Sequence, residues 1–179
     1  MEKTHKKYDF RLFTPGAKGF IKSSKTTNHK RILFGLVVSD ISFLSKIQHY
    51  SNKELEIAKT NEVNVKSLIQ GIGDSLENLI LELEKNILEL EKTIHNLNSS
   101  VSFKNIPDFE PITYPMNSSV QINKRIVFAM ILFDKYLMLL HKVFTTGLMS
   151  QKQRAIDRKR IGSLIQYFFN ETHRKVKPI

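Results

Sequence analysis

The histidines and carboxylates are the side chains that could carry acid–base or metal chemistry. The six histidines are scattered, and no two have the spacing that places a pair of ligands on one helix face: His5, His29, His49, His95, His141 and His173. Cysteine is absent, which excludes thiolate zinc sites, disulfides and cysteine nucleophiles. The densest carboxylates, Glu82 with Glu84 and Glu89 with Glu91, have lysines beside them and fit solvated ion pairs on a helix face. The sequence therefore predicts no metal site, no cofactor and no catalytic residue.

Three further features could suggest an enzyme. Asp134 is the one carboxylate inside an apolar run, and we expect it to pair with Lys135 or an arginine of the last helix in a structural role. A relaxase or nuclease would need a tyrosine or metal centre, but no histidine triad accompanies the tyrosines, which are Tyr8, Tyr50, Tyr114, Tyr136 and Tyr167. Residues 71–75 (GIGDS) lack the Gly-Lys-Ser/Thr ending of a phosphate loop and fit a helix break better. Binding is the better hypothesis than catalysis.

Basic side chains are concentrated at the two ends of the chain. The formal net charge is +11. Residues 1–31 hold nine Lys and Arg against two acidic residues, residues 53–95 hold five against nine, and residues 150–179 hold eight against two. Such asymmetry is typical of proteins that bind a polyanion, and nucleic acid is the first candidate. The alternative is an ordinary solvated surface.

The alternation of residues 7–13 predicts a short strand near the N-terminus. Tyr8, Phe10 and Leu12 share one side, while Lys7, Asp9 and Arg11 share the other. A two-stranded ribbon fits the DNA major groove, so the polar side could contact DNA. We expect one chain to supply one strand, and the ribbon would then require a dimer. The alternative is a disordered basic tail.

Two more basic groups could contact a phosphate backbone. The first precedes and opens a predicted helix, whose N-terminal amides favour anions; it comprises Lys25, Thr26, Thr27, Asn28, Lys30 and Arg31. The second lies in the first half of the last helix and comprises Arg154, Arg158, Lys159 and Arg160. This second patch could bind a nucleic acid backbone, or it could pair with the acidic helix over residues 76–91. Both interpretations stay open.

The pattern as a whole predicts a mainly α fold, a helical bundle with a short N-terminal strand. Thr14 and Pro15 are suited to begin a short helix that ends near Ser24, and a helix follows over residues 29–50. Residues 53–71 look helical but irregular, and Gly71 and Gly73 should loosen the chain there. Beyond them an apolar stripe predicts a helix to residue 97, which could pair within the fold or across a dimer; it comprises Ile72, Leu76, Leu79, Leu83, Ile87, Leu90, Ile94 and Leu97.

The second half of the chain begins with a proline-rich crossover over residues 101–121. Residues 112–114 could form a short edge strand within it. An apolar helix over residues 124–146 should end at Gly147, and Ser150 should cap a last helix to about Arg174, giving an antiparallel hairpin. The buried side of that last helix is expected to comprise Ile156, Ile161, Leu164, Ile165, Phe168 and Phe169.

The predicted division is a basic strand-helix-helix DNA-binding unit over residues 1–50 and a helical domain over residues 51–179, with one compact domain as the alternative. No apolar segment of the secretory type follows Met1. The best membrane-span candidate, residues 126–144, contains Asp134, Lys135, His141 and Lys142, so we expect it to be a helix buried in protein. These features predict a cytoplasmic protein with no membrane partner.

Three stretches resemble a family carried by integrating conjugative elements and conjugative plasmids. Residues 11–17 (RLFTPGA) resemble its RL-T-x-x-A opening. Residues 31–36 (RILFGL), continuing to Phe43-Leu44, resemble the following R-x-x-x-GL…FL helix. Residues 133–136 (FDKY) and 147–150 (GLMS) resemble the closing D-x-x…G helix hairpin. The family includes the AcaB-type transcriptional activators.

The resemblance implies a ribbon-helix-helix-like DNA-binding unit that regulates transfer or mobilisation genes. Under it, Phe10 and Leu12 face inward while Lys7, Asp9 and Arg11 face DNA. The resulting hypothesis is a dimeric regulator that binds double-stranded DNA, with other conjugation-element proteins as further candidate partners. The rival hypothesis is a non-enzymatic helical adaptor or structural component of a conjugation system, which would bind protein through the stripe over residues 72–97.

Overall fold

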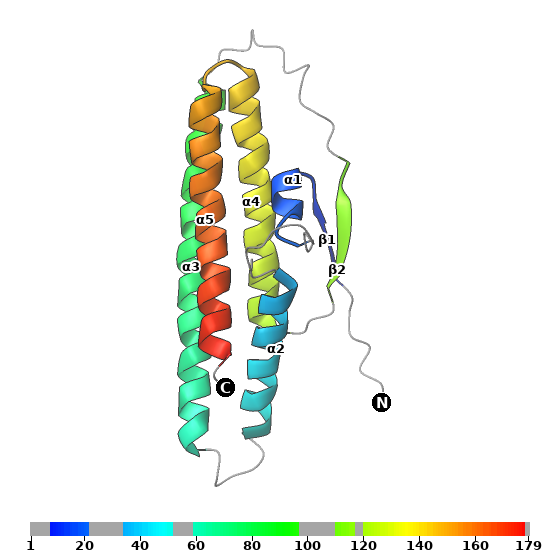
Figure 1. Ribbon diagram of the computed structural model, residues 1–179, viewed down its shortest axis with the longest axis vertical. Coiled ribbons are helices and arrows are strands. Elements are labelled where there is room, and N and C mark those ends of the chain that lie inside the picture. The colour runs from blue at the N-terminus through cyan, green and yellow to red at the C-terminus, as the bar shows by residue number, and fades with distance from the viewer. Residues whose placement is uncertain (1–7, 22–33, 52–58, 97–109, 117–119, 178–179) are drawn as a thin grey trace.

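Four long helices form the body of the computed structural model, and a two-stranded sheet lies along one side of it (Figure 1). The structure describes residues 8–21, 34–51, 59–96, 110–116 and 120–177. The four helices are α2 (Phe34–Ser51), α3 (Lys59–His95), α4 (Gln121–Thr145) and α5 (Gln151–Val176). A short helix, α1 (Pro15–Lys18), packs on α4 beside the sheet. The prediction of a mainly α fold with a short N-terminal strand is confirmed.

The sheet consists of β1 (Tyr8–Leu12) and β2 (Ile112–Met116), which pair antiparallel within one chain. Leu12 is opposite Ile112, and Tyr8 is opposite Met116. The expectation that one chain supplies only one strand was therefore wrong: the second strand comes from the proline-rich crossover. The predicted edge strand over residues 112–114 is confirmed and extends to Met116. Pro115 is tolerated because an edge strand need not donate every backbone hydrogen bond.

One hydrophobic cluster joins the sheet to the helices. Phe10 and Leu12 of β1 are buried, and Phe10 contacts Phe34 of α2 and stacks on Tyr114 of β2. The apolar stripe of α3 is buried in the same cluster from Ile72 to Ile87. The stripe of α3 therefore packs within the fold. Its periodicity alone could not distinguish this from pairing across a dimer.

The helix ends follow local chemistry. Thr14 caps α1 by accepting a hydrogen bond from the Ala17 amide, and Ser150 caps α5 by accepting one from the Gln153 amide. Gly147 has a φ of 78°, which glycine adopts without strain, and it ends the turn after α4. These three predictions are confirmed, and α4 and α5 form the expected hairpin (Figure 1).

Three details of the predicted elements were wrong. Helix α1 ends at Lys18 instead of Ser24, with Gly19 as its C-cap. Helix α3 continues through Gly71 and Gly73, because Ile72 and its neighbours pack into the core and offset the low helix propensity of glycine. Ile156 of α5 is exposed, because it lies five residues before the buried Ile161, which places it about 140° around the helix from that residue. In the part of the chain that the structure describes, no helix has an apolar stretch that would cross a membrane.

Candidate nucleic-acid interface

The polar side of the sheet carries the described part of the predicted DNA-contact strand. Asp9 and Arg11 are exposed, whereas Phe10 and Leu12 between them are buried. Across the sheet, Arg11 pairs with Thr113 and Asp9 pairs with Pro115. The exposed face is therefore a two-stranded ribbon with a guanidinium and a hydroxyl side by side. The sequence analysis missed Thr113, because nothing in the local pattern shows which strand pairs with β1.

Asp134 fixes the corner between the sheet and α1. Its side chain is 3% exposed, and its two oxygens accept hydrogen bonds from the Phe13 amide (2.7 Å), the Thr14 amide (2.7 Å) and the Thr14 hydroxyl (2.6 Å). The expectation that Asp134 pairs with a basic side chain was wrong. Backbone amides and a hydroxyl satisfy this carboxylate because α4 passes under the end of β1. Asp134 thus positions the ribbon and is not a contact residue.

A basic groove runs between this corner and α5. Arg158 and Lys159 are exposed on its rim, Ser163 and Gln166 add polar groups, and its volume is about 500 Å³. Gly16 forms part of its wall and lies close to α4: a Cβ atom built there would be 2.7 Å from Leu137 Cδ1 and 3.8 Å from the Arg158 guanidinium. The groove therefore brings the end of β1 and the basic half of α5 into one region.

The four residues of the second basic patch have different surroundings. Arg160 donates to Asn86 of α3 and forms an ion pair with Glu82 at 3.5 Å. Arg154 lies over the Phe144 ring, 4.6 Å from its centroid. Arg158 and Lys159 line the groove. Arg160 therefore pairs with the acidic helix, as one of the two interpretations predicted. A contact with nucleic acid stays a prediction for Arg154, Arg158 and Lys159.

The other predicted DNA-contact residues lie outside the described residues. They are Lys7, Lys25, Thr26, Thr27, Asn28, Lys30 and Arg31. Phe34, the first residue of α2, donates its amide to the Phe20 carbonyl at 3.1 Å, which joins the start of α2 to the turn after α1. Lys18, which the sequence analysis did not single out, donates to the Glu110 carbonyl at 2.7 Å and ties α1 to the segment before β2.

His141 lines a smaller cavity of about 150 Å³ next to this groove. Arg154, Arg158 and Gly16 also line the cavity. Burial, and secondarily the positive charge of Arg154, lowers the pKa of His141 from its ordinary value of 6.5. The neutral imidazole is therefore the form that the folded chain favours.

The lowered pKa predicts a loss of stability on acidification. Below about pH 6.5 the unfolded chain binds a proton at His141 that the folded chain resists, so the free energy of unfolding falls as the pH falls. We expect His141→Gln to lose less stability than the wild type between about pH 7.5 and pH 5.5 in urea melts. The matched control, His95→Gln at the exposed end of α3, should behave as the wild type does. Equal pH dependence of all three proteins would contradict this role.

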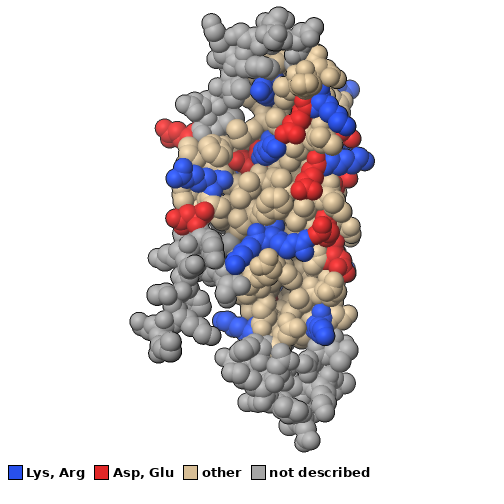
Figure 2. Space-filling model, turned by 180° about the vertical axis from the view of Figure 1, so that it is seen from behind, with Lys and Arg blue, Asp and Glu red and all other residues tan. Residues whose placement is uncertain are grey.

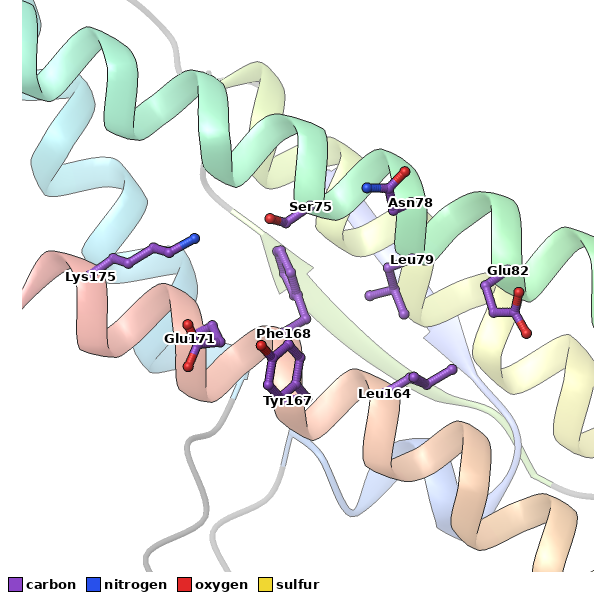
Figure 3. A pocket seen from close by; sticks show the side chains of 9 residues that line it. All are labelled: Ser75, Asn78, Leu79, Glu82, Leu164, Tyr167, Phe168, Glu171 and Lys175. Carbon is purple, nitrogen blue, oxygen red and sulfur yellow. The ribbon is translucent and has the colours of Figure 1, made fainter.

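A separate pocket of about 290 Å³ lies between α3 and α5 (Figure 3). In the close-up, Phe168 and Leu79 lie between the two helices, whereas Glu82 and Lys175 are at opposite ends. Glu82 already accepts hydrogen bonds from Asn86 and pairs with Arg160. Among the described residues, no three His, Asp or Glu side chains lie together as metal ligands.

Comparison with known proteins shows the fold. The chain superposes on the crystal structure of selenomethionine-containing AcaB from uropathogenic E. coli with a TM-score of 0.72. The match covers 96% of this chain and 78% of AcaB, at 13% sequence identity. No protein-family model matches the sequence, and no curated protein matches it. The chain therefore has an AcaB-like fold.

Proposed function

We propose, from the AcaB-like fold and the basic surface around its sheet, that this chain is a DNA-binding transcriptional regulator of conjugative-transfer or mobile-element genes. The single observation that supports it most is the ribbon of β1 and β2, which presents Arg11 beside Thr113 on its exposed side. A two-stranded ribbon fits the major groove, and arginine is the side chain that most often reads guanine there. No catalytic step is required.

The proposed binding mode has two parts. The ribbon enters the major groove and Arg11 contacts a base edge, while the basic groove of α5 lies against the adjacent phosphates. Phosphate contacts supply affinity and base contacts supply specificity. Gly16 and Arg158 connect the two parts, because the end of β1 leads directly into the wall of the groove. Because one chain completes the ribbon, the major-groove contact does not itself require a dimer.

The adaptor hypothesis would use the stripe over residues 72–97 as its binding surface. The stripe residues from Ile72 to Ile87 would have to be exposed to bind a partner protein, but they pack in the hydrophobic core, which supports the regulator proposal over the adaptor.

Arg11→Gln should weaken binding to the preferred site about tenfold and weaken binding to unrelated DNA less, because a lost base contact removes specificity as well as charge. Fluorescence anisotropy with both duplexes measures the two affinities. Lys85→Gln, which removes a positive charge from the exposed surface of α3, is the matched control and should change neither. An Arg11→Gln protein with wild-type affinity and specificity would contradict the placement of the ribbon.

Genome-wide footprinting of the tagged protein tests the regulatory role. Discrete occupied sites upstream of transfer or mobilisation genes would support a regulator. Uniform occupancy, or none, would contradict it.

A further inference from the structure

The small cavity where α1, α4 and α5 meet has charged lining groups of one sign. Arg154 and Arg158 of α5 line it, together with His141 of α4, and its volume is about 150 Å³. The rest of its lining is neutral and comes from the start of α1 and two leucines of α4. Among the described residues, no carboxylate lines this cavity. Every titratable group around it is therefore positive or becomes positive when it binds a proton.

Neither of these two arginines is neutralised by a carboxylate of the described chain. Arg160, on the same helix, pairs with Glu82. Arg154 and Arg158 form no ion pair with any residue that the structure describes. The buried Asp134 of α4 accepts hydrogen bonds from the amides that follow β1 instead. The cavity therefore concentrates positive potential, which attracts anions and repels cations.

Many other charged side chains on the described surface are balanced over short distances. On the face that Figure 2 shows, blue and red side chains lie next to one another. Helices α3 and α4 are joined in this way by the ion pairs Arg125–Glu77 and Lys135–Glu91. Two guanidiniums without a carboxylate partner beside one cavity depart from this arrangement, and an anionic ligand would supply the missing charge.

The two guanidiniums are positioned by their neighbours before any ligand binds. Arg154 lies over the Phe144 ring, 4.6 Å from its centroid, in a cation–π contact. Arg158 follows one helical turn later on the same side of α5, and its guanidinium is 3.8 Å from the place where a Cβ atom of residue 16 would be. Side chains that are already ordered lose less entropy when they bind. A guanidinium has a rigid fork of donors that matches two oxygens of a phosphoryl group.

We propose that this cavity binds the phosphoryl group of a small phosphorylated ligand, with Arg154 and Arg158 donating to its oxygens. The volume of about 150 Å³ equals that of roughly five water molecules in the liquid, which is enough for a tetrahedral oxyanion and too little for a whole nucleotide. The cavity adjoins the larger groove beside α5 and shares Gly16 and Arg158 with it. The site goes beyond the proposed DNA binding and is tested without DNA.

His141 should couple ligand binding to pH. An oxyanion beside the imidazole stabilises its protonated form, so the bound chain takes up a proton and the affinity should rise as the pH falls. The charged groups that face His141 across the cavity are Arg154 and Arg158 of α5, whereas α1 contributes only Thr14, Pro15 and Gly16. Asp157 lies between the two arginines in the sequence but does not line the cavity.

Sulfate is the probe for the site, because it stays a dianion over the whole pH range and has the shape of a phosphoryl group. Titration at constant ionic strength, with chloride as the balancing anion, is followed by ¹H–¹⁵N NMR. Wild-type protein should bind sulfate saturably with a dissociation constant below about 10 mM. Arg154→Gln should bind at least about tenfold more weakly, because it loses a charge-assisted contact. Arg174→Gln is the charge-matched control, because Arg174 pairs with Glu171 near the other end of α5, and it should bind as the wild type does.

Two results of this titration would overturn the site. One is the absence of saturable shifts at the residues that line the cavity, and the other is an Arg154→Gln protein with wild-type affinity for sulfate. The pH dependence adds a readout that a merely structural role would not change. The affinity of the wild type should rise at least about threefold from about pH 7.5 to pH 5.5, and that of His141→Gln should change less. An equal pH dependence of the two proteins would overturn the role of His141.

A variant that fills the cavity separates a free ligand from a phosphate of DNA. His141→Phe adds volume from α4 without removing an arginine, and circular dichroism checks that it is folded. It should weaken sulfate binding at least about tenfold and leave the affinity for duplex DNA unchanged. An equal loss of duplex affinity would show that the cavity holds a DNA phosphate and would overturn the free ligand. A wild-type chain that binds sulfate but not duplex DNA would support this site and contradict the proposed function, and the opposite result would do the reverse.

Discussion

Asp134→Ala is expected to lower the free energy of unfolding by about 3 kcal/mol, because it removes a buried acceptor and leaves its donors unsatisfied. The carboxylate accepts from the Phe13 amide, the Thr14 amide and the Thr14 hydroxyl, all at 2.6–2.7 Å. Hydrogen bonds to a charged group are stronger than neutral ones, and the two amides have no helix or ladder partner nearby to replace them. Urea unfolding followed by circular dichroism measures the change.

Three further variants separate this role from a general effect of mutation. Asp74→Ala removes an exposed carboxylate of α3 that accepts from Gln70, and it should change stability by less than about 0.5 kcal/mol. Thr14→Val removes the hydroxyl and the cap of α1 together and should cost about 1–2 kcal/mol. Asp134→Asn keeps an acceptor oxygen and should lie between the wild type and Asp134→Ala. An Asp134→Ala protein as stable as Asp74→Ala would contradict the role of the corner.

The second large effect concerns DNA binding through α5. Replacing Arg154, Arg158 and Lys159 together with glutamine should weaken binding to duplex DNA about 100-fold, because each phosphate contact contributes roughly 1 kcal/mol at moderate salt. These three residues border the groove and the adjoining cavity that lie beside Gly16. The loss should be similar for preferred and unrelated DNA, since phosphates carry no sequence. Anisotropy titrations with the two duplexes measure it.

A charge-matched control lies on the same helix. Arg174, Lys175 and Lys177 are at the other end of α5, where Arg174 lies about 24 Å along the helix from Arg158. Replacing these three with glutamine removes the same net charge and should reduce affinity less than about threefold, because charges beyond a Debye length contribute little. Equal losses in the two triple variants would mean that net charge, not the groove, determines binding.

The elements were predictable where local chemistry decides them. Alternation in residues 7–13 identified β1 and its buried side, Thr14 and Ser150 identified two helix starts, and Gly147 identified a turn. The stripe of α3 identified a helix but not what covers it, since a core stripe and a dimer seam look alike. Gly71 and Gly73 wrongly suggested a helix break, because the packing of the residues beside them outweighs the low helix propensity of glycine.

The candidate interface was less predictable because its parts are distant in the chain. Arg11 pairs with Thr113 across the sheet, and Asp134 binds an amide and hydroxyl 120 residues earlier. A buried aspartate in an apolar helix is expected to find a cation, but unpaired amides at the end of a strand satisfy it equally well. The second basic patch was unpredictable for the same reason. Its residues are neighbours in the sequence, and only the packing of α5 on α3 determines that Arg160 pairs with Glu82 while Arg158 and Lys159 line the groove.

The affinity of the wild-type chain for duplex DNA, measured between about 50 and 200 mM salt, tests the central claim most directly. If the ribbon and the α5 groove hold a duplex, the logarithm of the association constant should fall linearly with the logarithm of the salt concentration, with a slope of about −3 or steeper. A protein that does not bind duplex DNA at about 50 mM salt, or whose affinity does not change with salt, would contradict the account.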